Sequence, residues 1–476
     1  MKIRLYLVAA LSVFLLGQMM APRGVCADEP MVPLSGQQPR VEGVETWPSA
    51  PWDQVLRMQI RFKIRNQELF KQFGEEQHDL RSPNYQRALT DEEFMADFAP
   101  TAADFEAVAD WLRKAGFEIE EAYHGKVSYI KFNGTVAQAA RAFGTPIVMS
   151  PIGKYTNASA PPIPARFADV ISYVLGLEDF TTVVPDFQQG TNPVGFGVSD
   201  LRTFYNISPL LSSGGDGSGQ CIAIVSVSNF LDAAPTAFNQ TFGLPAFSAS
   251  NLSRVFASGG ADPGRTSDET EALVGIEWAH AVAPGAPIRV YIGDPSLPNS
   301  SGAVDAITRA VIDDACATIS VPFDFCTLSA SFFTDTLAPL FSTAAMTNMQ
   351  SVFVASGNQG AAGRVLDPTT GQCVTGTSRN AKETAASPDV TAVGGTQFTP
   401  VYDASNNNVG FVSETVWKDA TGAAGAARVR CSQSRPIRRA SACPMTRSGT
   451  SQTWRWGRAL PRPASTWASQ KEPPAC

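Results

Sequence analysis

Continuous apolar runs alternate with helix-like segments between residues 221 and 393. The runs occupy 221–227, 288–292, 318–321, 351–355 and 390–393. Runs of this length, separated by helical segments, are typical of buried strands in a parallel sheet with helices on both faces. The pattern therefore predicts an α/β domain over this part of the chain.

Residues 45–180 follow a different pattern. Thr101 stands three residues before an acid, a spacing that begins helices, and Thr135 begins a second, shorter helical pattern. Between them, 117–119 and 126–132 have the composition and alternation of strands. We expect a small α+β domain with an antiparallel sheet and no catalytic cluster.

Three other segments lack periodic structure. Residues 28–44 are rich in Pro and Gly and are expected to be loose, and 181–197 have the composition of a linker and cleavage region. From 428 to 476 there are ten Lys or Arg and one Glu, so this tail carries +9 and leaves −16 for the rest of the chain, whose total is −7. No hydrophobic period runs through the tail, so it is not expected to supply strands.

One stretch, 268–286, predicts a helix that carries a candidate general base. It begins with acidic residues, ends at a Pro-Gly pair and is followed by an apolar strand. Glu271 lies near its start, where a carboxylate on an α/β scaffold can act as a base. The expected apolar face consists of Leu273, Val274, Trp278 and Ala281. The simpler alternative is an amphipathic helix with a solvated acid.

Composition limits the class of protein. The chain has 476 residues, 44% hydrophobic and 17% charged, which is enough for two or three domains, and its acidic balance gives no reason to expect nucleic acid. Lys2 and Arg4 precede an apolar run over 5–16 and small residues before Asp28, which predicts a cleaved secretory signal at 1–27. No later stretch is long enough to span a membrane, so we expect a secreted protein; an uncleaved anchor is the alternative.

Histidines and cysteines exclude two kinds of site. Of three histidines only His280 falls in the α/β part, and neither an acid after the first strand nor an H-G-T-H segment is present, so a Ser-His-Asp peptidase is disfavoured. A carboxylate base, which suits acidic pH, is the remaining way to activate a Ser on such a fold. The eight cysteines have no CxxC spacing for zinc; Cys221, inside an apolar run, is expected to be a small core residue.

The 268–286 stretch, E-x-x-x-G-I-E-W-A-H-A-x-A-P-G-A from Glu271, resembles the corresponding helix of the serine-carboxyl peptidases, the sedolisin and kumamolisin family. The resemblance implies that Glu271 is the base for a Ser nucleophile. It also implies an assisting Asp four residues later, where this chain has Gly275. A calcium loop belongs to the family's C-terminus but has no counterpart here, so no metal or other cofactor is expected.

Two further segments resemble the family's substrate cleft. Residues 351–360, SVFVASGNQG, resemble A-x-G-D-x-G, whose Asp stabilises the oxyanion; Asn358 takes its place and can donate a hydrogen bond without needing to be protonated. Residues 318–322 resemble the substrate-lining I-S-x-S, with Pro322 for the second Ser and one backbone N–H fewer. By resemblance Cys326 and Cys373 are the candidate disulfide pair.

The first domain resembles the activation domain of pro-kumamolisin. The matching segments are 82–94, 110–117, 130–145 and 157–165. The resemblance implies a propeptide that assists folding and masks the active site until it is cut; an unrelated binding module is the alternative. The family nucleophile belongs to G-T-S-x-x-x-P, and Ser451, in Gly449-Thr450-Ser451, is only a weak candidate because Gln452, Thr453 and Trp454 follow.

Together these observations predict an α/β, subtilisin-like parallel sheet with flanking helices, preceded by a small α+β activation domain. The expected organisation is a signal at 1–27, the activation domain at 45–180, a linker at 181–197, an incomplete peptidase domain at 198–427 and the basic tail at 428–476. We hypothesise a change of reading frame near Ala426; a genuine basic tail is the alternative. The expected partners are a protein or peptide substrate and the chain's own propeptide, and we expect this chain itself to be inactive. A non-catalytic pseudoprotease or a frame-changed remnant is the other interpretation.

Overall fold

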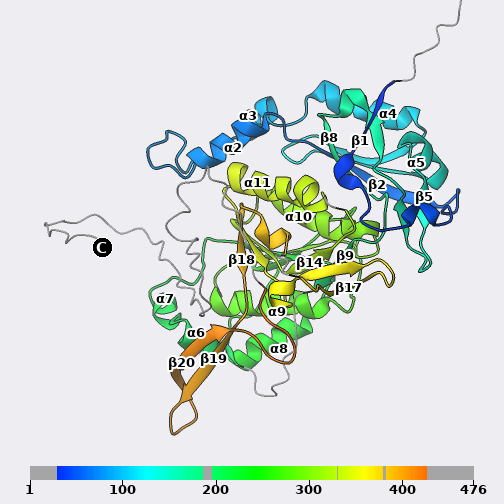
Figure 1. Cartoon of the computed structure of the whole chain (residues 1–476). Helices are drawn as coiled ribbons and strands as arrows, with labels where there is room; N and C mark the ends of the chain where they lie inside the picture. Colours follow the sequence, from blue (N-terminus) through cyan, green and yellow to red (C-terminus); the bar gives the residue numbers. More distant parts are fainter. Residues whose placement is uncertain (1–28, 186–195, 330, 379–381, 426–476) are drawn as a thin grey trace, which may run out of the picture. The chain divides into compact units, whose positions relative to one another are not determined.

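Six parallel strands form the central sheet, in the order β11-β12-β10-β13-β15-β18 (Figure 1). The computed structural model of the chain describes residues 29–185, 196–329, 331–378 and 382–425. All of them belong to the first of two contact-defined units, which ends at Ile437. In sequence order the strands are Ile222–Ser226 (β10), Leu252–Phe256 (β11), Ile288–Ile292 (β12), Thr318–Val321 (β13), Ser351–Ala355 (β15) and Val390–Val393 (β18). The parallel sheet of the expected α/β, subtilisin-like class is confirmed.

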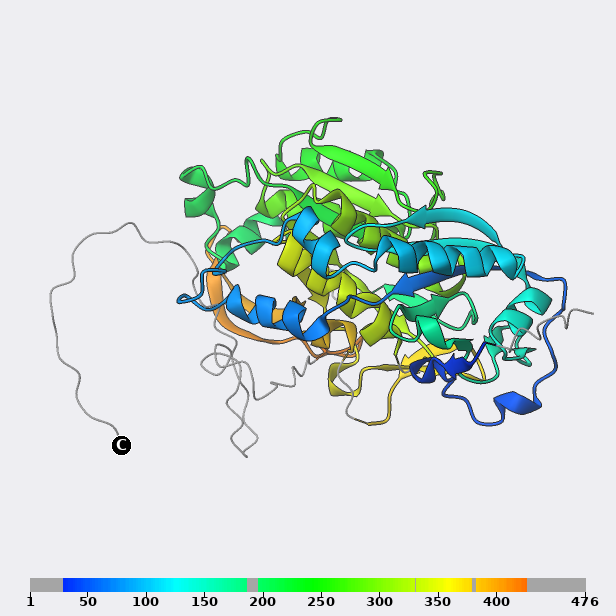
Figure 2. The same ribbon diagram turned by 90° about the horizontal axis from the view of Figure 1, so that it is seen from above.

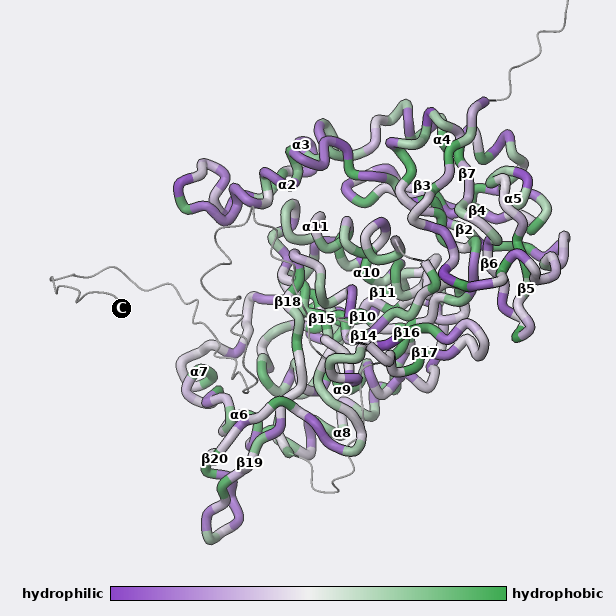
Figure 3. The backbone as a smooth tube through the Cα atoms, in the orientation of Figure 1, coloured by the Kyte–Doolittle hydropathy of each residue, from purple (hydrophilic) through white to green (hydrophobic). Residues whose placement is uncertain are grey.

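Helices cover both faces of this sheet. On one face α9 (Glu269–Val282) packs on β10 and is itself covered by α8 (Ala233–Phe242). On the other face α10 (Ser301–Asp313) and α11 (Ala338–Thr347) pack on the same strands. Alternate residues of β10 therefore enter two separate hydrophobic cores, with Ile224 on the α9 side and Ala223 and Val225 on the α10 side. Figure 3 shows the hydrophobic colour concentrated in these central strands.

The first part of the chain forms the expected antiparallel sheet, in the order β3-β4-β2-β8. Its strands are Val55–Phe62 (β2), Glu118–Tyr123 (β3), Tyr129–Thr135 (β4) and Ile171–Leu175 (β8). Two helices, α4 (Ala102–Lys114) and α5 (Val136–Ala142), pack on it. Thr101 accepts a hydrogen bond from the Asp104 N–H, and Thr135 forms a capping box with Gln138, so both predicted helix starts are confirmed.

Other elements connect and extend the two parts. Two helices of the first part, α2 (Gln67–Glu76) and α3 (Asp91–Asp97), lie beside α11 in both ribbon views (Figures 1 and 2). A hairpin follows the sheet: β19 (Thr396–Tyr402) and β20 (Asn408–Val416). Shorter elements include α6 (Val198–Phe204), α7 (Ser208–Ser212), β5 (Ile147–Met149), β6 (Tyr155–Asn157), β16 (Arg364–Asp367) and β17 (Gln372–Thr375).

The structure corrects the expectation that 28–44 is loose, and it adds a strand at the start of the expected linker. Within 28–44, β1 (Met31–Pro33) pairs with β7 (Pro162–Pro164). Within the expected linker, β9 (Thr182–Pro185) pairs antiparallel with β14 (Phe323–Cys326). Strand partners distant in the sequence order both segments, which their own composition does not reveal. The signal at 1–27, the rest of the linker at 186–195 and the tail at 428–476 lie outside the described residues.

The apolar face predicted for α9 is only partly confirmed: Ala281 is fully buried and Leu273 packs against the core. Leu273, Val274 and Trp278 are only partly buried, whereas Ala272 and Ile276 are fully buried against β10. The reason is that α9 lies in the middle of a layer: Trp278 packs on Phe238 of α8 on its outer side. A helix with apolar neighbours on two sides has no single apolar stripe in its sequence.

Cys221 packs against the core as expected, but it is only partly buried and forms a disulfide with Cys316, which was not predicted. This bond joins the start of β10 to the residue two before β13, its neighbour in the sheet. The second disulfide, Cys326–Cys373, confirms the pair inferred from the family resemblance. Within the described residues every helix is too short or too polar to cross a bilayer.

Replacing the first disulfide should destabilise the chain. The bond closes a loop of 95 residues, and such cross-links contribute about 2–4 kcal/mol. We expect the double variant Cys221→Ala/Cys316→Ala to lose that much free energy of unfolding in urea titration, with Cys326→Ala/Cys373→Ala as the matched control for the shorter loop. Free thiols at Cys221 and Cys316 in the native, unreduced protein would contradict the assignment.

Gly275 gives a second test, of helix packing. An alanine avoids a helix-interior glycine's cost of about 1 kcal/mol. Its Cβ would, however, lie 3.3 Å from Ile224 Cγ2, so that side chain must move slightly. We therefore expect Gly275→Ala to change the free energy of unfolding by less than about 1 kcal/mol. A loss well above that in thermal or urea unfolding would show that Ile224 cannot move aside.

Candidate active site

The first turn of α9 is fixed at the carboxyl end of β10. The Thr266 N–H donates to Ser228 Oγ at 2.9 Å, and the Asn229 N–H donates to the Gly264 carbonyl at 2.9 Å. These bonds join the segment before α9 to the residues that directly follow β10. The helix therefore begins at the carboxyl edge of the sheet, the edge where α/β proteins place ligands.

Glu271 occupies this first turn and is buried, with 7% of its surface exposed. The alternative of a solvated acid on an exposed face is therefore wrong. The nearest acids along the helix differ from it in their environment. Glu269 pairs with Arg265 at 2.7 Å and also accepts from the Leu231 N–H. Asp268 is half-buried, and this burial raises its pKa above its ordinary value.

The position one turn further, where the family has an assisting Asp, faces an apolar strand residue. Gly275 has ordinary helical geometry, and a Cβ added to it would contact only Ile224, through Cγ2 and Cδ1, within 4 Å. No carboxylate therefore shares the face of Glu271 at this position. Glu277, whose pKa is raised by burial, is six residues beyond Glu271 and lies far round the helix from it.

Asn358 follows β15 at the same edge of the sheet. Gly357 has φ +93°, a left-handed conformation that glycine adopts readily, and this turns the chain so that Asn358 is 9% exposed. Backbone bonds from a later segment hold the turn: the Ala423 N–H donates to the Asn358 carbonyl at 3.0 Å, and the Gly425 N–H donates to the Gly357 carbonyl at 2.7 Å. Asn358 is thus presented by a rigid backbone.

A buried charge cluster beside this turn was missed in the sequence. Asp324, on β14, lies 3.9 Å from both Lys382 Nζ and Arg364 Nε, and all three side chains are largely buried. Its Oδ2 is 4.0 Å from the point where a Cβ on Gly357 would lie. A signal was present, because a charged residue interrupts the apolar strand Phe323–Cys326.

The same cluster lines a cavity of about 210 Å³. Its walls combine Arg40, Thr327, Ser329 and Glu383 with the apolar side chains of Phe325, Leu328, Phe333 and Leu366. Burial raises the pKa of Glu383, an effect that Arg40 opposes. With the charge cluster in its wall, the cavity is lined by more polar and charged groups than apolar ones.

The order of the strands places Glu271 and Asn358 at the same end of the parallel sheet. β13 lies between β10 and β15, and neighbouring strands are about 4.8 Å apart, so the carboxyl ends of β10 and β15 are about 10 Å apart. Glu271 belongs to the first of these ends and Asn358 to the second. Pro322 follows β13 between them, at the point where the chain leaves the parallel sheet for β14.

The other candidate residues are His280 and Ser451. His280 is nine residues after Glu271, about 13 Å along the helix axis, and it is buried with its Nε2 at 2.9 Å from the Pro245 carbonyl. Burial lowers its pKa. Ser451, the candidate nucleophile, lies outside the described residues. Within the described ranges no three His, Cys, Asp or Glu side chains gather as a metal site would require.

Comparisons with known proteins agree with this architecture. The family described as pro-kumamolisin, activation domain, matches residues 43–180. Sedolisin of Pseudomonas sp. (strain 101) is 25% identical over 380 residues, 76% of this chain and 62% of sedolisin. Kumamolisin of Bacillus sp. (strain MN-32) is 28% identical over 254 residues, 49% of this chain and 44% of kumamolisin. Xanthomonalisin of Xanthomonas sp. (strain T-22) is 24% identical over 428 residues, 80% of this chain and 49% of xanthomonalisin.

Among solved structures, Pseudomonas sedolisin in complex with pseudo-iodotyrostatin matches 48% of this chain and 61% of its own, with 21% identity and a TM-score of 0.38. A mutant of the Staphylococcus aureus epidermin leader peptide processing serine protease matches 72% and 70%, with 12% identity and a TM-score of 0.40. The chain spans between 44% and 62% of the length of the three curated relatives. The activation-domain match and these three relatives support membership of this chain in the sedolisin family.

Proposed function

We propose that this chain is an exported sedolisin-type serine-carboxyl peptidase pro-form that retains a peptide-binding edge but does not turn over peptides by itself. The proposal depends mainly on which residues lie at the carboxyl ends of the parallel strands. Buried Glu271 at the end of β10 and Asn358 at the end of β15 are kept, whereas Gly275 places no acid beside Glu271.

The chemistry of acyl transfer explains why the kept positions are not enough. A Ser hydroxyl attacks a peptide carbonyl only when a base takes its proton while donors hold the oxyanion. Glu271 offers the base, and the Asn358 amide offers a donor that does not titrate. A missing oxyanion donor costs about 10²–10³ in rate, but loss of the nucleophile leaves only residual rate. The substrate class, proteins or peptides, is proposed from the family resemblance, and acidic working conditions are proposed from the carboxylate base.

Catalysis can be tested directly on the full chain. We expect no peptidase turnover on an unfolded protein substrate at any pH from 2 to 8, before or after removal of the activation domain. Gly275→Asp with Asn358→Asp should not restore it, because neither change supplies a nucleophile. A C-terminal graft carrying G-T-S-x-x-x-P together with both acids should produce cleavage at acidic pH.

Two results would contradict this proposal. Turnover by the unmodified chain that disappears in Ser451→Ala would make the tail a working part of the enzyme. Failure of the grafted chain to cleave, although its circular dichroism matches that of the parent, would instead remove Glu271 from the role of base. Calorimetric titration with a peptide aldehyde separates a peptide-binding pseudoprotease, which gives a saturable heat of binding, from a remnant that gives none.

Export is the second part of the proposal. Two disulfides within the described residues support it, because stable disulfides form in oxidising compartments. We expect the protein recovered from the medium of an expressing cell to begin at Asp28, as judged by N-terminal sequencing. Recovery with residues 1–27 attached, in the membrane fraction, would favour the uncleaved anchor.

A further inference from the structure

The last turn of α11 is enclosed by the first part of the chain. Met346 is 4% exposed and packs among Phe70, Phe73, Leu89, Phe94 and Phe98 of the helices α2 and α3 and their connection. Gly74 of α2 gives it space: a Cβ there would lie 2.4 Å from Met346 Cε. The missing side chain of one helix therefore forms a notch for the side chain of the other.

The first part of the chain also donates hydrogen bonds to the backbone of this turn. The last carbonyls of a helix have no partner inside it. The Gln350 N–H satisfies the Ala344 carbonyl from within α11's own half. The Met346 carbonyl instead accepts from the Leu89 N–H at 3.0 Å and from Gln77 Nε2 at 3.1 Å. Both donors come from the connection between α2 and α3.

A buried lysine completes the contact where two helices end together. Asn348 directly follows α11, and its Nδ2 donates at 2.7 Å to the Val311 carbonyl in the last turn of α10. Lys126 Nζ donates at 2.8 Å to Asn348 Oδ1, with its side chain only 8% exposed. The acids facing Lys126 are Asp91 at 3.3 Å, from its own half, and Asp314 at 4.0 Å, just after α10. A cation is favoured at the negative end of a helix dipole.

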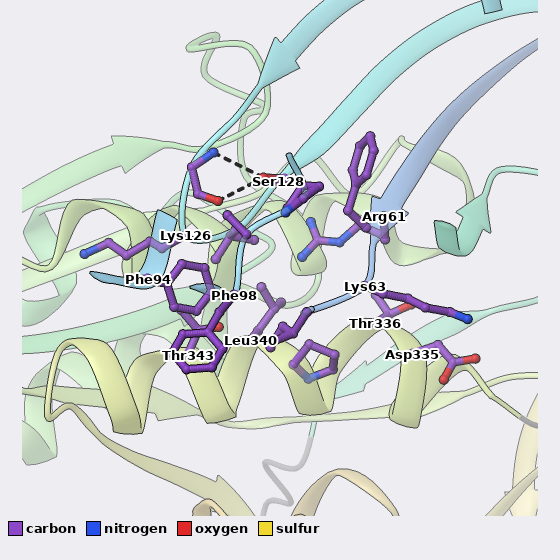
Figure 4. A pocket seen from close by; sticks show the side chains of 17 residues that line it. Arg61, Lys63, Phe94, Phe98, Lys126, Ser128, Asp335, Thr336, Leu340 and Thr343 are labelled. Atoms are coloured by element: carbon purple, nitrogen blue, oxygen red, sulfur yellow. Dashed lines mark hydrogen bonds between the residues drawn. The ribbon is translucent and has the colours of Figure 1, made fainter. Parts of the chain in front are cut away.

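The contact is looser towards the middle of α11. A cavity of about 20 Å³, room for about one water, lies between Arg61 and Phe98 on one side and Leu340 and Thr343 on the other. Figure 4 shows the side chains that line it. Thr336 Oγ1, on its wall, has no hydrogen-bond partner among the described residues. The contact at the helix ends is therefore packed more closely than this part of the interface.

An ion pair and a hydrogen bond also join the two parts at the middle of α10. Lys131 lies 3.0 Å from Asp305, and Arg61 donates to Thr308 at 3.4 Å. Burial raises the pKa of Asp305, although Lys131 beside it acts in the opposite direction. A buried ion pair gives little net stability, since desolvation offsets the attraction. This pair therefore does not replace the contact at the helix ends.

We propose that the C-terminal ends of α10 and α11 are the surface by which the half with the six-stranded parallel sheet recognises the activation half. In the activation half, the Gly74 notch and Lys126 make this contact specific. The partner of this surface is segment 66–99 together with Lys126. The contact forms within the intact chain, and after cleavage of the linker it holds the two fragments together. The inference goes beyond the proposed function and does not depend on catalysis.

The test uses the full chain with a specific protease site placed within 186–195, so that the halves stay together after cutting only through their contacts. Gly74→Leu should fill the notch and speed dissociation of the cut protein at least tenfold in dilution experiments. Met346→Ala should also speed it. The double variant Gly74→Leu/Met346→Ala should dissociate more slowly than Gly74→Leu alone, because the added side chain takes the vacated space.

Controls separate recognition from general damage. Leu69→Ala, on the same helix but 48% exposed, should leave dissociation within twofold of the parent. Amide exchange over 345–350 should rise at least tenfold in Lys126→Met and in the separated halves. The proposal is overturned if the two substitutions at the notch act additively, if Leu69→Ala matches Gly74→Leu, or if exchange over 345–350 is the same in cut and separated protein. A Gly74→Leu chain that fails to fold leaves the exchange comparison on the parent to decide the question.

Discussion

The constraint on which the candidate site depends is that parallel strands end at a common edge. β10, β13 and β15 are neighbours, so the residues that follow them are brought together whatever their separation in the sequence. The hydrogen bonds from the 264–266 segment to the end of β10 add the start of α9 to this edge, and with it Glu271. The Gly357 turn adds Asn358. Without the sheet order, a buried acid and a buried amide 87 residues apart in sequence would have no common location.

The departures from the family pattern follow from the same packing. Gly275 lies against Ile224, so the strand that fixes the position of Glu271 also makes the next turn of the helix apolar. An acid placed there must find a partner at the edge of the sheet or remain in contact with an aliphatic side chain, which is costly for a charge. The charge cluster of Asp324, Lys382 and Arg364 concentrates the buried polar groups on the β15 side of the edge instead.

Much of the fold could be predicted because its signals are local. Thr101 and Thr135 begin helices through side-chain bonds within three residues, and continuous apolar runs mark five of the six parallel strands. The strand β11 was not predicted because it is an outermost strand of the sheet, is only half-buried throughout and carries Arg254.

What could not be predicted depends on partners distant in the sequence. The disulfide of Cys221 requires β10 and β13 to be neighbours, and no spacing shows that. The helix pattern marked Glu271 as a candidate, family resemblance added Asn358, and the strand order places both at the carboxyl ends of the parallel strands. The roles of Glu271 and Asn358 and the identity of the nucleophile remain predictions, and Ser451 lies outside the described residues.

The central claim is that the edge keeps its base and oxyanion positions but has no activated serine. A peptidyl diphenyl phosphonate forms a covalent adduct only with a serine whose hydroxyl is activated. Intact mass measurement of the chain after incubation with this reagent, at pH 4 and at pH 7 and with the activation domain cut away, should show only the unmodified mass. An adduct that maps to Ser451, or to any serine at the carboxyl ends of β10, β13 or β15, would contradict the account.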